Sequence, residues 1–345
     1  MTRHPALRLD GLEVRFGDRP GLAPLSFAVK RGERLAVVGT SGAGKSSLLR
    51  TIAGLQPHGA GSVFIEGRDC TDLPPEGRGS VYLHQTPLLF PHLNVSGNVA
   101  FPLRVRKLPR AVIQRRVRDV LHALGVADLA ARTPASLSGG QRHRVALARA
   151  IAAQPPVLLL DEPLASLDPP LRAEARDAIL NATNDYAPAV ILVTHDLAEA
   201  GWLADRIGVI LDGRLAQLTS PDILFTRPVS PAVASFVGFS NRLDGIIDDG
   251  GIFRAGPLAL PLPTNFNGPA VLLFRPEAVR VTGEGSLQAR VLDVHFAPGT
   301  VRLHLRLNEL EFQAECTLPS SRAISGGIVA FELDPQHLVL FPAST

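Results

Sequence analysis

The stretch that decides the fold is Gly39-Thr-Ser-Gly-Ala-Gly-Lys-Ser46. The apolar run Arg34-Leu-Ala-Val-Val38 ends directly before it, and a segment of helical composition follows it, closed by Gly54. A buried strand, a glycine-rich loop and a helix in this order begin a parallel α/β unit and match the full pattern of a phosphate-binding loop. The sequence therefore predicts an α/β fold of the P-loop NTPase class.

The residue types of this loop suit phosphate chemistry. Glycines let backbone N–H groups converge on phosphate oxygens at the positive end of a helix. Lys45 is predicted to reach the β and γ phosphates, and the Ser46 hydroxyl is predicted to ligate Mg²⁺. We therefore expect ATP and Mg²⁺ as ligands, with the nucleotide held by Gly39, Thr40, Ser41, Gly42, Ala43, Gly44, Lys45, Ser46 and Ser47.

Two further apolar runs end in side chains that can act on a phosphate. Val157-Leu-Leu-Leu160 is followed by Asp161 and Glu162, and Val190-Ile-Leu-Val-Thr194 is followed by His195. Ligands of open α/β sheets bind at the carboxyl ends of the strands, so we expect these side chains at one edge. Asp161 is the predicted metal ligand, Glu162 the group that orients or deprotonates the attacking water, and His195 a hydrogen-bonding partner of the γ-phosphate and the water.

A second loop of phosphate-binding character lies about twenty residues before the acidic strand. Leu137, Ser138, Gly139, Gly140 and Gln141 stand at the start of the helical stretch Gln141 to Ala150, where N–H groups again face outward. Because the first loop already covers one side of a nucleotide, the second is predicted to act on a nucleotide held by another copy. The expected partner is therefore a second copy of the chain, with ATP between the two.

With these motifs in this order, the chain resembles the nucleotide-binding subunit of an ATP-binding-cassette transporter. The resemblance implies an adenine-stacking role for Phe16, a metal- and water-sensing role for Gln85, and a dimer-contacting turn at Ser166-Leu167-Asp168. His84 and Ser47 depart from the commoner residues at their positions, and neither departure removes a group that the chemistry needs.

The resemblance also implies partners. In the family, the segment corresponding to Thr86 to Asn98 meets the coupling helices of membrane permease subunits, and this segment is unusually apolar for a loop. We expect such subunits, and indirectly a substrate-binding protein, as partners. The chain itself is expected at the cytoplasmic face of the inner membrane, as a peripheral subunit that is soluble when isolated.

Composition along the chain predicts two domains. A mostly helical subdomain at about 86–155 interrupts the core sheet of an ATPase domain at 1–237, and short alternating strands separated by Gly and Pro fill 238–345. In the strand Val301 to Leu307, Val, Leu, Leu and Leu alternate with Arg, His and Arg, as a half-buried strand requires. The second domain, with Leu273-Phe-Arg-Pro-Glu277 its most distinctive string, is similar to the oligomer-binding-type (TOBE-like) regulatory domains of importer ATPases.

Bulk properties restrict the alternatives. Of 345 residues, 46% are hydrophobic and 19% charged, with a net charge of +3, which indicates a globular protein without a continuous basic surface for nucleic acid. The two cysteines, Cys70 and Cys316, match no metal or redox spacing and are expected as free thiols in a reducing compartment. No signal peptide and no apolar run of about 18 residues is found.

The predicted function is an ATPase that energises solute import. Its alternatives are a soluble ATPase of DNA repair, a translation factor of the same superfamily, and a small-molecule kinase. Repair ATPases insert a long coiled coil between phosphate loop and signature, and translation factors carry two cassettes; neither feature occurs here. The pairing of Glu162 with His195 favours water over another acceptor. Ferric ion, polyamine, sulfate or molybdate, and sugar all remain open as substrates.

Overall fold

The computed structural model describes residues 4–16, 19–165, 167–282, 287–317 and 327–343. Its contacts divide the chain into two compact units, residues 1–221 and 222–345, which are described separately below. The domain boundary expected after Val237 stays a prediction.

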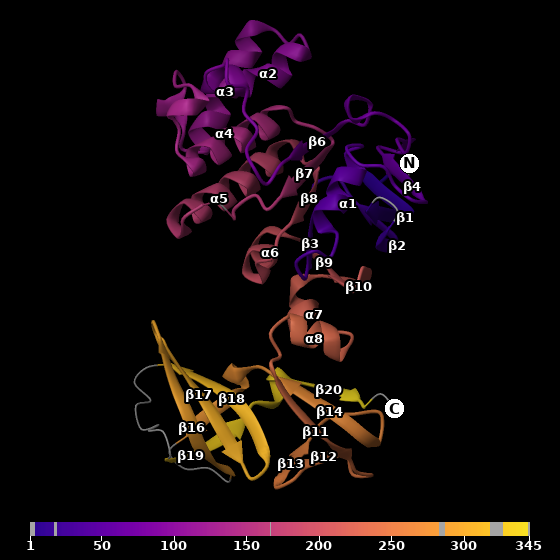
Figure 1. Ribbon diagram of the computed structural model, residues 1–345, viewed down its shortest axis with the longest axis vertical. Coiled ribbons are helices and arrows are strands. Elements are labelled where there is room, and N and C mark those ends of the chain that lie inside the picture. Colours follow the sequence, from indigo (N-terminus) through magenta and orange to yellow (C-terminus); the bar gives the residue numbers. More distant parts are fainter. Residues whose placement is uncertain (1–3, 17–18, 166, 283–286, 318–326, 344–345) are drawn as a thin grey trace. The chain divides into compact units, whose positions relative to one another are not determined.

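A six-stranded sheet in the order β10-β9-β3-β8-β7-β6 forms the centre of the first unit (Figure 1). The pairs within β9-β3-β8-β7-β6 are parallel, and β10 lies antiparallel on β9. Every residue of β7 and β8 is buried, which explains their uninterrupted apolar sequences. The strands are β3 (Arg34–Gly39), β6 (Ser80–Leu83), β7 (Val157–Asp161), β8 (Ala189–Val193), β9 (Arg206–Leu211) and β10 (Arg214–Thr219).

A second, antiparallel sheet in the order β2-β1-β4-β5 shares one hydrophobic core with the first. Residues 7–16 form one continuous strand, because the bulges in it shift its register without ending the pairing with β2. Helix α1 (Lys45–Ile52) contributes Leu48, Leu49 and Ile52 to the shared core. The strands are β1 (Leu7–Phe16), β2 (Arg19–Val29), β4 (Ser62–Ile65) and β5 (Arg68–Asp69).

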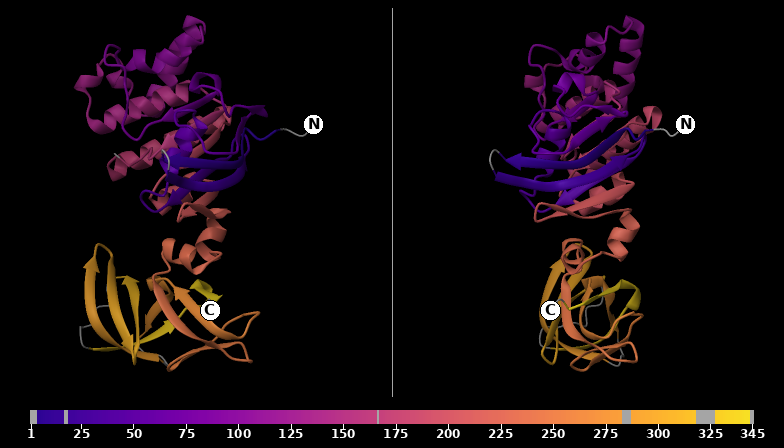
Figure 2. Two further views of the ribbon diagram at one scale, coloured as in Figure 1. Left: turned by 45° about the vertical axis from the view of Figure 1, so that its right-hand side comes forward. Right: turned by 90° about the vertical axis from the view of Figure 1, so that its right-hand side faces the viewer.

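Three helices form a separate group at one end of this unit, as both figures show (Figures 1 and 2). They are α2 (Val95–Val105), α3 (Arg110–Ala123) and α4 (Gly139–Ala152), and they lie in sequence between β6 and β7, which are neighbours in the sheet. The sheet is thus interrupted by a helical insertion and then resumed, as the sequence predicted. Helices α5 (Pro169–Tyr186) and α6 (Leu197–Leu203), with the short turns η1 (Pro75–Gly77), η2 (Ala127–Leu129) and η3 (Pro134–Ser136), complete the unit.

The second unit contains two five-stranded antiparallel sheets around one core (Figure 2). The alternation predicted for residues 301–307 is confirmed, since Val301, Leu303, Leu305 and Leu307 are buried. The first sheet has the order β13-β12-β11-β14-β20, with β11 (Asn241–Ile247), β12 (Ile252–Ala255), β13 (Leu258–Pro261), β14 (Gly268–Phe274) and β20 (Leu338–Pro342). The second has the order β15-β19-β16-β17-β18, with β15 (Val279–Thr282), β16 (Leu287–Ala297), β17 (Thr300–Leu307), β18 (Leu310–Thr317) and β19 (Ile328–Leu333).

Short helices accompany these sheets: α7 (Pro221–Thr226), α8 (Pro231–Phe236), η4 (Pro276–Ala278) and η5 (Pro335–His337). The fold class predicted from the sequence, an α/β core with a helical insertion followed by a β-rich domain, is confirmed. Cys70 and Cys316 are both free. Within the described ranges, none of the helices combines the length and apolarity needed to cross a membrane.

Candidate nucleotide-binding site

The phosphate loop follows β3 at the carboxyl edge of the parallel sheet. Gly39 must be glycine here, because a Cβ would stand 2.3 Å from the backbone oxygen of Ile210 on β9. Gly42 and Gly44 adopt positive φ values of 79° and 92°, a conformation that side-chain-bearing residues rarely take, and Gly44 caps α1. Thr40, Ser41 and Gly42 are exposed, Ala43 is half-buried, and Ser47 is buried at the start of α1. The loop thus turns backbone groups outward while its ends stay fixed.

Lys45 lies inside the loop rather than in solvent. Only 8% of its surface is exposed, and Nζ donates hydrogen bonds of 2.9 Å to the carbonyl oxygens of Gly39 and Thr40. Burial lowers the pKa of Lys45, while the charges of Glu162 and Asp161 act in the opposite direction. Its ammonium therefore already stands at the loop, beside carboxylates whose field favours its charged form.

Asp161 ends β7 opposite the first turn of α1. Asp161 is 2% exposed, and its Oδ1 accepts a 2.8 Å hydrogen bond from the Ser46 hydroxyl. Two oxygen groups at this separation suit a hard cation such as Mg²⁺, which prefers oxygen ligands and keeps several waters or phosphate oxygens of its own. Among the described residues, no three His, Cys, Asp or Glu side chains gather as a ligand shell. The residues present therefore fit a magnesium ion that a nucleotide helps to hold.

Glu162 and His195 lie together, one residue and two residues beyond the ends of β7 and β8. His195 Nδ1 is 3.0 and 2.9 Å from the two carboxylate oxygens of Glu162. Glu162 has φ of 51°, a left-handed conformation that is uncommon for a side-chain-bearing residue, and its N–H donates to the Val193 carbonyl at 2.9 Å. The hydrogen bond of the His195 ring with the Glu162 carboxylate raises the pKa of His195. The pair is thus an acid and a base held in contact at the strand ends.

The signature loop is built as a capped helix start. The Ser138 Oγ accepts from the Gln141 N–H at 3.2 Å, and Gln141 Oε1 accepts from the Ser138 N–H at 3.0 Å, which forms a capping box. Leu137 is buried, Ser138 and Gly139 are exposed, and Gly140 is half-buried. A Cβ on Gly139 would meet nothing within 4 Å. Across the described residues, no hydrogen bond joins this loop to the phosphate loop of the same chain.

The residues assigned by resemblance are described to different extents. Gln85 follows β6 and is exposed. Phe16 is the last residue of β1, and its side chain lies outside the described part of the chain. Asp168 is exposed and is the N-cap residue of α5, whereas Ser166, in the same predicted turn, lies outside the described residues.

Sequence reasoning missed two residues beside the site. Tyr82, on β6, donates a 2.6 Å hydrogen bond to Oδ2 of Asp161. Glu199, on α6, is 4% exposed and accepts a 2.8 Å hydrogen bond from the Thr194 hydroxyl, which in turn accepts from the N–H of Asp196. Glu199 thereby ties α6 to the residues flanking His195. No motif marks either residue, because each acts through the neighbour it contacts.

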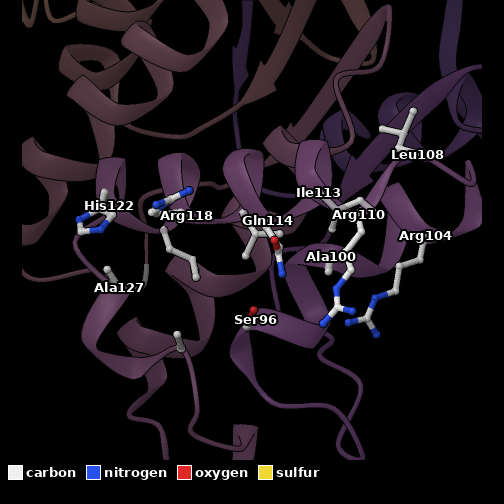
Figure 3. A pocket seen from close by; sticks show the side chains of 13 residues that line it. Ser96, Ala100, Arg104, Leu108, Arg110, Ile113, Gln114, Arg118, His122 and Ala127 are labelled. Carbon is white, nitrogen blue, oxygen red and sulfur yellow. The ribbon is translucent and has the colours of Figure 1, made fainter.

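A groove of about 580 Å³ runs between α2 and α3 (Figure 3). Its lining combines small or apolar residues with basic ones and contains no carboxylate: Ser96, Ala100, Arg104, Leu108, Arg110, Ile113, Gln114, Val117, Arg118, Leu121, His122, Ala127 and Ala130. Figure 3 shows the side chains of Arg104 and Arg110 close together at one end of it. One lining residue, Ser96, is the second residue of α2 and belongs to the apolar segment 86–98.

Comparisons with known proteins place these features. Residues 22–165 match the ABC transporter family model, and residues 272–341 match the TOBE domain model. A sulfate/thiosulfate import ATP-binding protein of Rhizobium meliloti (strain 1021) is 38% identical over 97% of this chain and 99% of its own length.

The chain belongs to the ABC transporter family.

Other ABC relatives are named for different substrates. A molybdate/tungstate import ATP-binding protein of Thermococcus kodakarensis (strain ATCC BAA-918 / JCM 12380 / KOD1) is 43% identical over 76% of this chain and 79% of its own. An Fe(3+) ions import ATP-binding protein of Streptomyces coelicolor (strain ATCC BAA-471 / A3(2) / M145) is 38% identical over 98% and 97%. A solved ATP-binding subunit of an ABC transporter superposes with a TM-score of 0.59 at 26% identity, covering 64% of this chain and 91% of that one. The resemblance drawn from the motifs is confirmed, and this ABC chain is an ATPase.

We expect Glu199 to make the stability of this ABC ATPase depend on pH. Burial raises its pKa from an ordinary 4.5 to about 7, so between these values the carboxyl is protonated in the folded chain and ionised in the unfolded one. The contribution of Glu199 to the free energy of unfolding is therefore fully present at the acid end of this window and is lost as pH rises through 7. Because one pKa unit corresponds to about 1.4 kcal/mol, the loss approaches about 3 kcal/mol.

We expect Glu199→Gln to remove this fall of unfolding free energy with pH, so that the variant is more stable than the wild type at pH 8 and similar to it at pH 5. Urea unfolding followed by the fluorescence of Trp202, the single tryptophan and a residue of α6, measures both. If the unfolding free energies of the two proteins change with pH in the same way, the pH dependence does not come from Glu199.

Proposed function

We propose that this chain is the ATP-hydrolysing subunit of a solute importer, that it works as a dimer with ATP between two copies, and that it docks on membrane permease subunits. The observation that carries the proposal is the pairing of Glu162 and His195 at 2.9 Å, beside a phosphate loop whose lysine already points into the loop. The relatives are named as import proteins, which supports the import direction. A periplasmic or surface binding protein and the permease would select the solute.

The proposed hydrolysis uses water as the acceptor. Glu162 orients a water and takes its proton as the water oxygen bonds to the γ-phosphorus, and the bond to the β,γ-bridging oxygen breaks to release ADP. His195, now bonded to Glu162, would turn its ring to the γ-phosphate when ATP arrives, and this releases the carboxylate for the water. Ser46, Asp161 and Gln85 would hold Mg²⁺, which neutralises phosphate charge when bound.

The remaining surface of the nucleotide is assigned to the second copy. Ser138 caps α4, and Gly139 and Gly140 begin it; Ser138 and Gly139 are exposed and Gly140 is half-buried. In the described structure these residues make no hydrogen bond to the phosphate loop of their own chain. A helix start with free N–H groups favours the charge of a γ-phosphate. Asp168, which precedes α5, would contribute to the same dimer contact, and Phe16 would stack on the adenine.

The first prediction separates binding from chemistry. Glu162→Gln should reduce ATP turnover by at least about a hundredfold, because the proton acceptor is lost, while ATP binding persists. The variant should also form a stable ATP-bound dimer on a sizing column. Lys45→Ala is the matched comparison, since it should weaken binding itself. Normal hydrolysis by the Glu162 variant would refute the assigned base.

The groove between α2 and α3 is the proposed docking surface for a permease helix. Its floor is apolar and its rim carries Arg104, Arg110, Arg118 and His122 with no acidic lining residue, which fits an amphipathic helix with acidic side chains (Figure 3). The neighbouring segment carries Leu88, 56% exposed, and Phe90, which stacks on Phe101 and lies under Arg149. Both features favour a helix lying across the groove and the segment 86–98.

We predict that the double change Arg104→Glu and Arg110→Glu lowers recovery of permease subunits at least about tenfold, because it reverses the charge at the groove. The measurement is copurification of the permease with the tagged full chain from its own membranes. Arg115 and Arg116, on α3 but outside the groove lining, provide the matched double control, which should leave recovery unchanged. ATP binding should stay normal in both. Unchanged recovery in the groove variant, and in a Leu89→Asp, Phe90→Asp variant, would remove the docking assignment.

A further inference from the structure

Both oxygens of the Asp161 carboxylate are hydrogen-bonded to hydroxyl groups. Oδ1 accepts from Ser46 at 2.8 Å and Oδ2 accepts from Tyr82 at 2.6 Å. Ser46 belongs to the phosphate loop and comes from α1, whereas Tyr82 comes from β6 on the other side of β7. The carboxylate is thus held from two directions, and the second hold is unrelated to any sequence motif.

The pairing of two strands places the tyrosine. β6 runs parallel to β7 with Tyr82 opposite Leu159 and Leu83 opposite Leu160, so the tyrosine lies just short of the strand end where Asp161 emerges. Its ring packs against the main core and meets the His84 ring edge-on, with 4.5 Å between ring centroids. A half-buried ring fixed on two sides can direct its hydroxyl to one place.

The tyrosine hydroxyl can act only as a donor to this partner. A carboxylate oxygen accepts hydrogen bonds, whereas a phenol carries an O–H that it can donate. At 2.6 Å the Tyr82 hydroxyl therefore presents its O–H to Oδ2 of Asp161. A donor at Oδ2 leaves Oδ1 facing the Ser46 hydroxyl.

We propose that Tyr82 is a positioning residue of the magnesium site: its hydroxyl fixes the Asp161 carboxylate in the orientation that serves the metal held with Ser46. The inference rests on the proposed magnesium site. Groups that orient metal-binding side chains from behind affect metal affinity or activity by about 10- to 100-fold when they are removed. Without the Tyr82 hydroxyl, Oδ2 of Asp161 loses its hydrogen-bond donor, and because Asp161 is only 2% exposed, water cannot easily replace it. The carboxylate is then free to rotate.

The test uses Tyr82→Phe, which removes one oxygen and keeps the ring. The affinity of the full chain for the nonhydrolysable analogue AMP-PNP is measured over a Mg²⁺ titration and again in EDTA. We expect the variant to need about tenfold more Mg²⁺ for half-maximal tightening of binding, with unchanged affinity in EDTA. An unchanged Mg²⁺ requirement would overturn the proposal.

The chain supplies a matched control, because it contains two tyrosines. Tyr186 ends α5, and its hydroxyl is buried without a hydrogen-bond partner among the described residues. Tyr186→Phe thus removes a buried hydroxyl from a half-buried ring away from Asp161 and should leave the Mg²⁺ requirement at the wild-type value. A shift equal to that of Tyr82→Phe would assign the effect to the loss of a tyrosine hydroxyl in general and contradict the proposal.

A second measurement needs neither nucleotide nor the Tyr82 variant. In metal-free chain labelled with ¹³C at tyrosine Cζ, the two resonances are distinguished with Tyr186→Phe. Asp161→Asn should shift the Tyr82 resonance, because the charged acceptor is gone, and should leave the Tyr186 resonance in place. If the Tyr82 resonance does not shift in Asp161→Asn, the proposed hydrogen bond between Tyr82 and Asp161 is absent and the proposal fails.

The outcomes separate the inference from the proposed function. If AMP-PNP binds the wild type equally well with Mg²⁺ and with EDTA, the magnesium assignment itself fails. If the wild type depends on Mg²⁺ and Tyr82→Phe matches it, only the role of Tyr82 fails.

Discussion

The parallel pairing of β3, β7 and β8 is the constraint on which the site depends. β8 pairs with β3 on one side and with β7 on the other, so the chain leaves all three strands at the same edge of the sheet. The hydrogen bond from the Glu162 N–H to the Val193 carbonyl extends this pairing by one residue beyond β7, and the one from the Thr194 N–H to Val37 extends it beyond β8. Groups separated by more than a hundred residues in sequence, such as Ser46 and Asp161, meet because backbone hydrogen bonds leave them no other register.

One backbone-strained residue, Glu162, stands where this pairing ends. Glu162 adopts a left-handed conformation that costs a side-chain-bearing residue about 1–2 kcal/mol, and such outliers persist only where their surroundings enforce them. The result is that the carboxylate turns toward His195 rather than continuing the strand direction. Glu199, buried behind His195 and bonded to Thr194, supports the same turn from α6. The reactive pair is therefore held by backbone on one side and by a buried carboxyl on the other.

The sequence predicted the parts of the site that depend on local pattern. Apolar runs followed by Asp161, Glu162 and His195 predict strand ends, and strand ends of a parallel sheet share an edge. The helical insertion and the β-rich domain could also be predicted, because changes in hydrophobic periodicity are local patterns. Tyr82 and Glu199 could not be predicted, because their contacts depend on which strands are neighbours and on how side chains are buried.

We propose that each ATP is bound between two copies, with Lys45 from one and Ser138 from the other. The decisive experiment measures the rate of ATP hydrolysis per chain as purified protein is diluted over several decades of concentration. We expect this rate to fall steeply once pairs dissociate, and we expect the Ser138→Arg variant to be inactive at every concentration. A rate per chain that stays constant on dilution, together with a fully active Ser138 variant, would contradict this proposal.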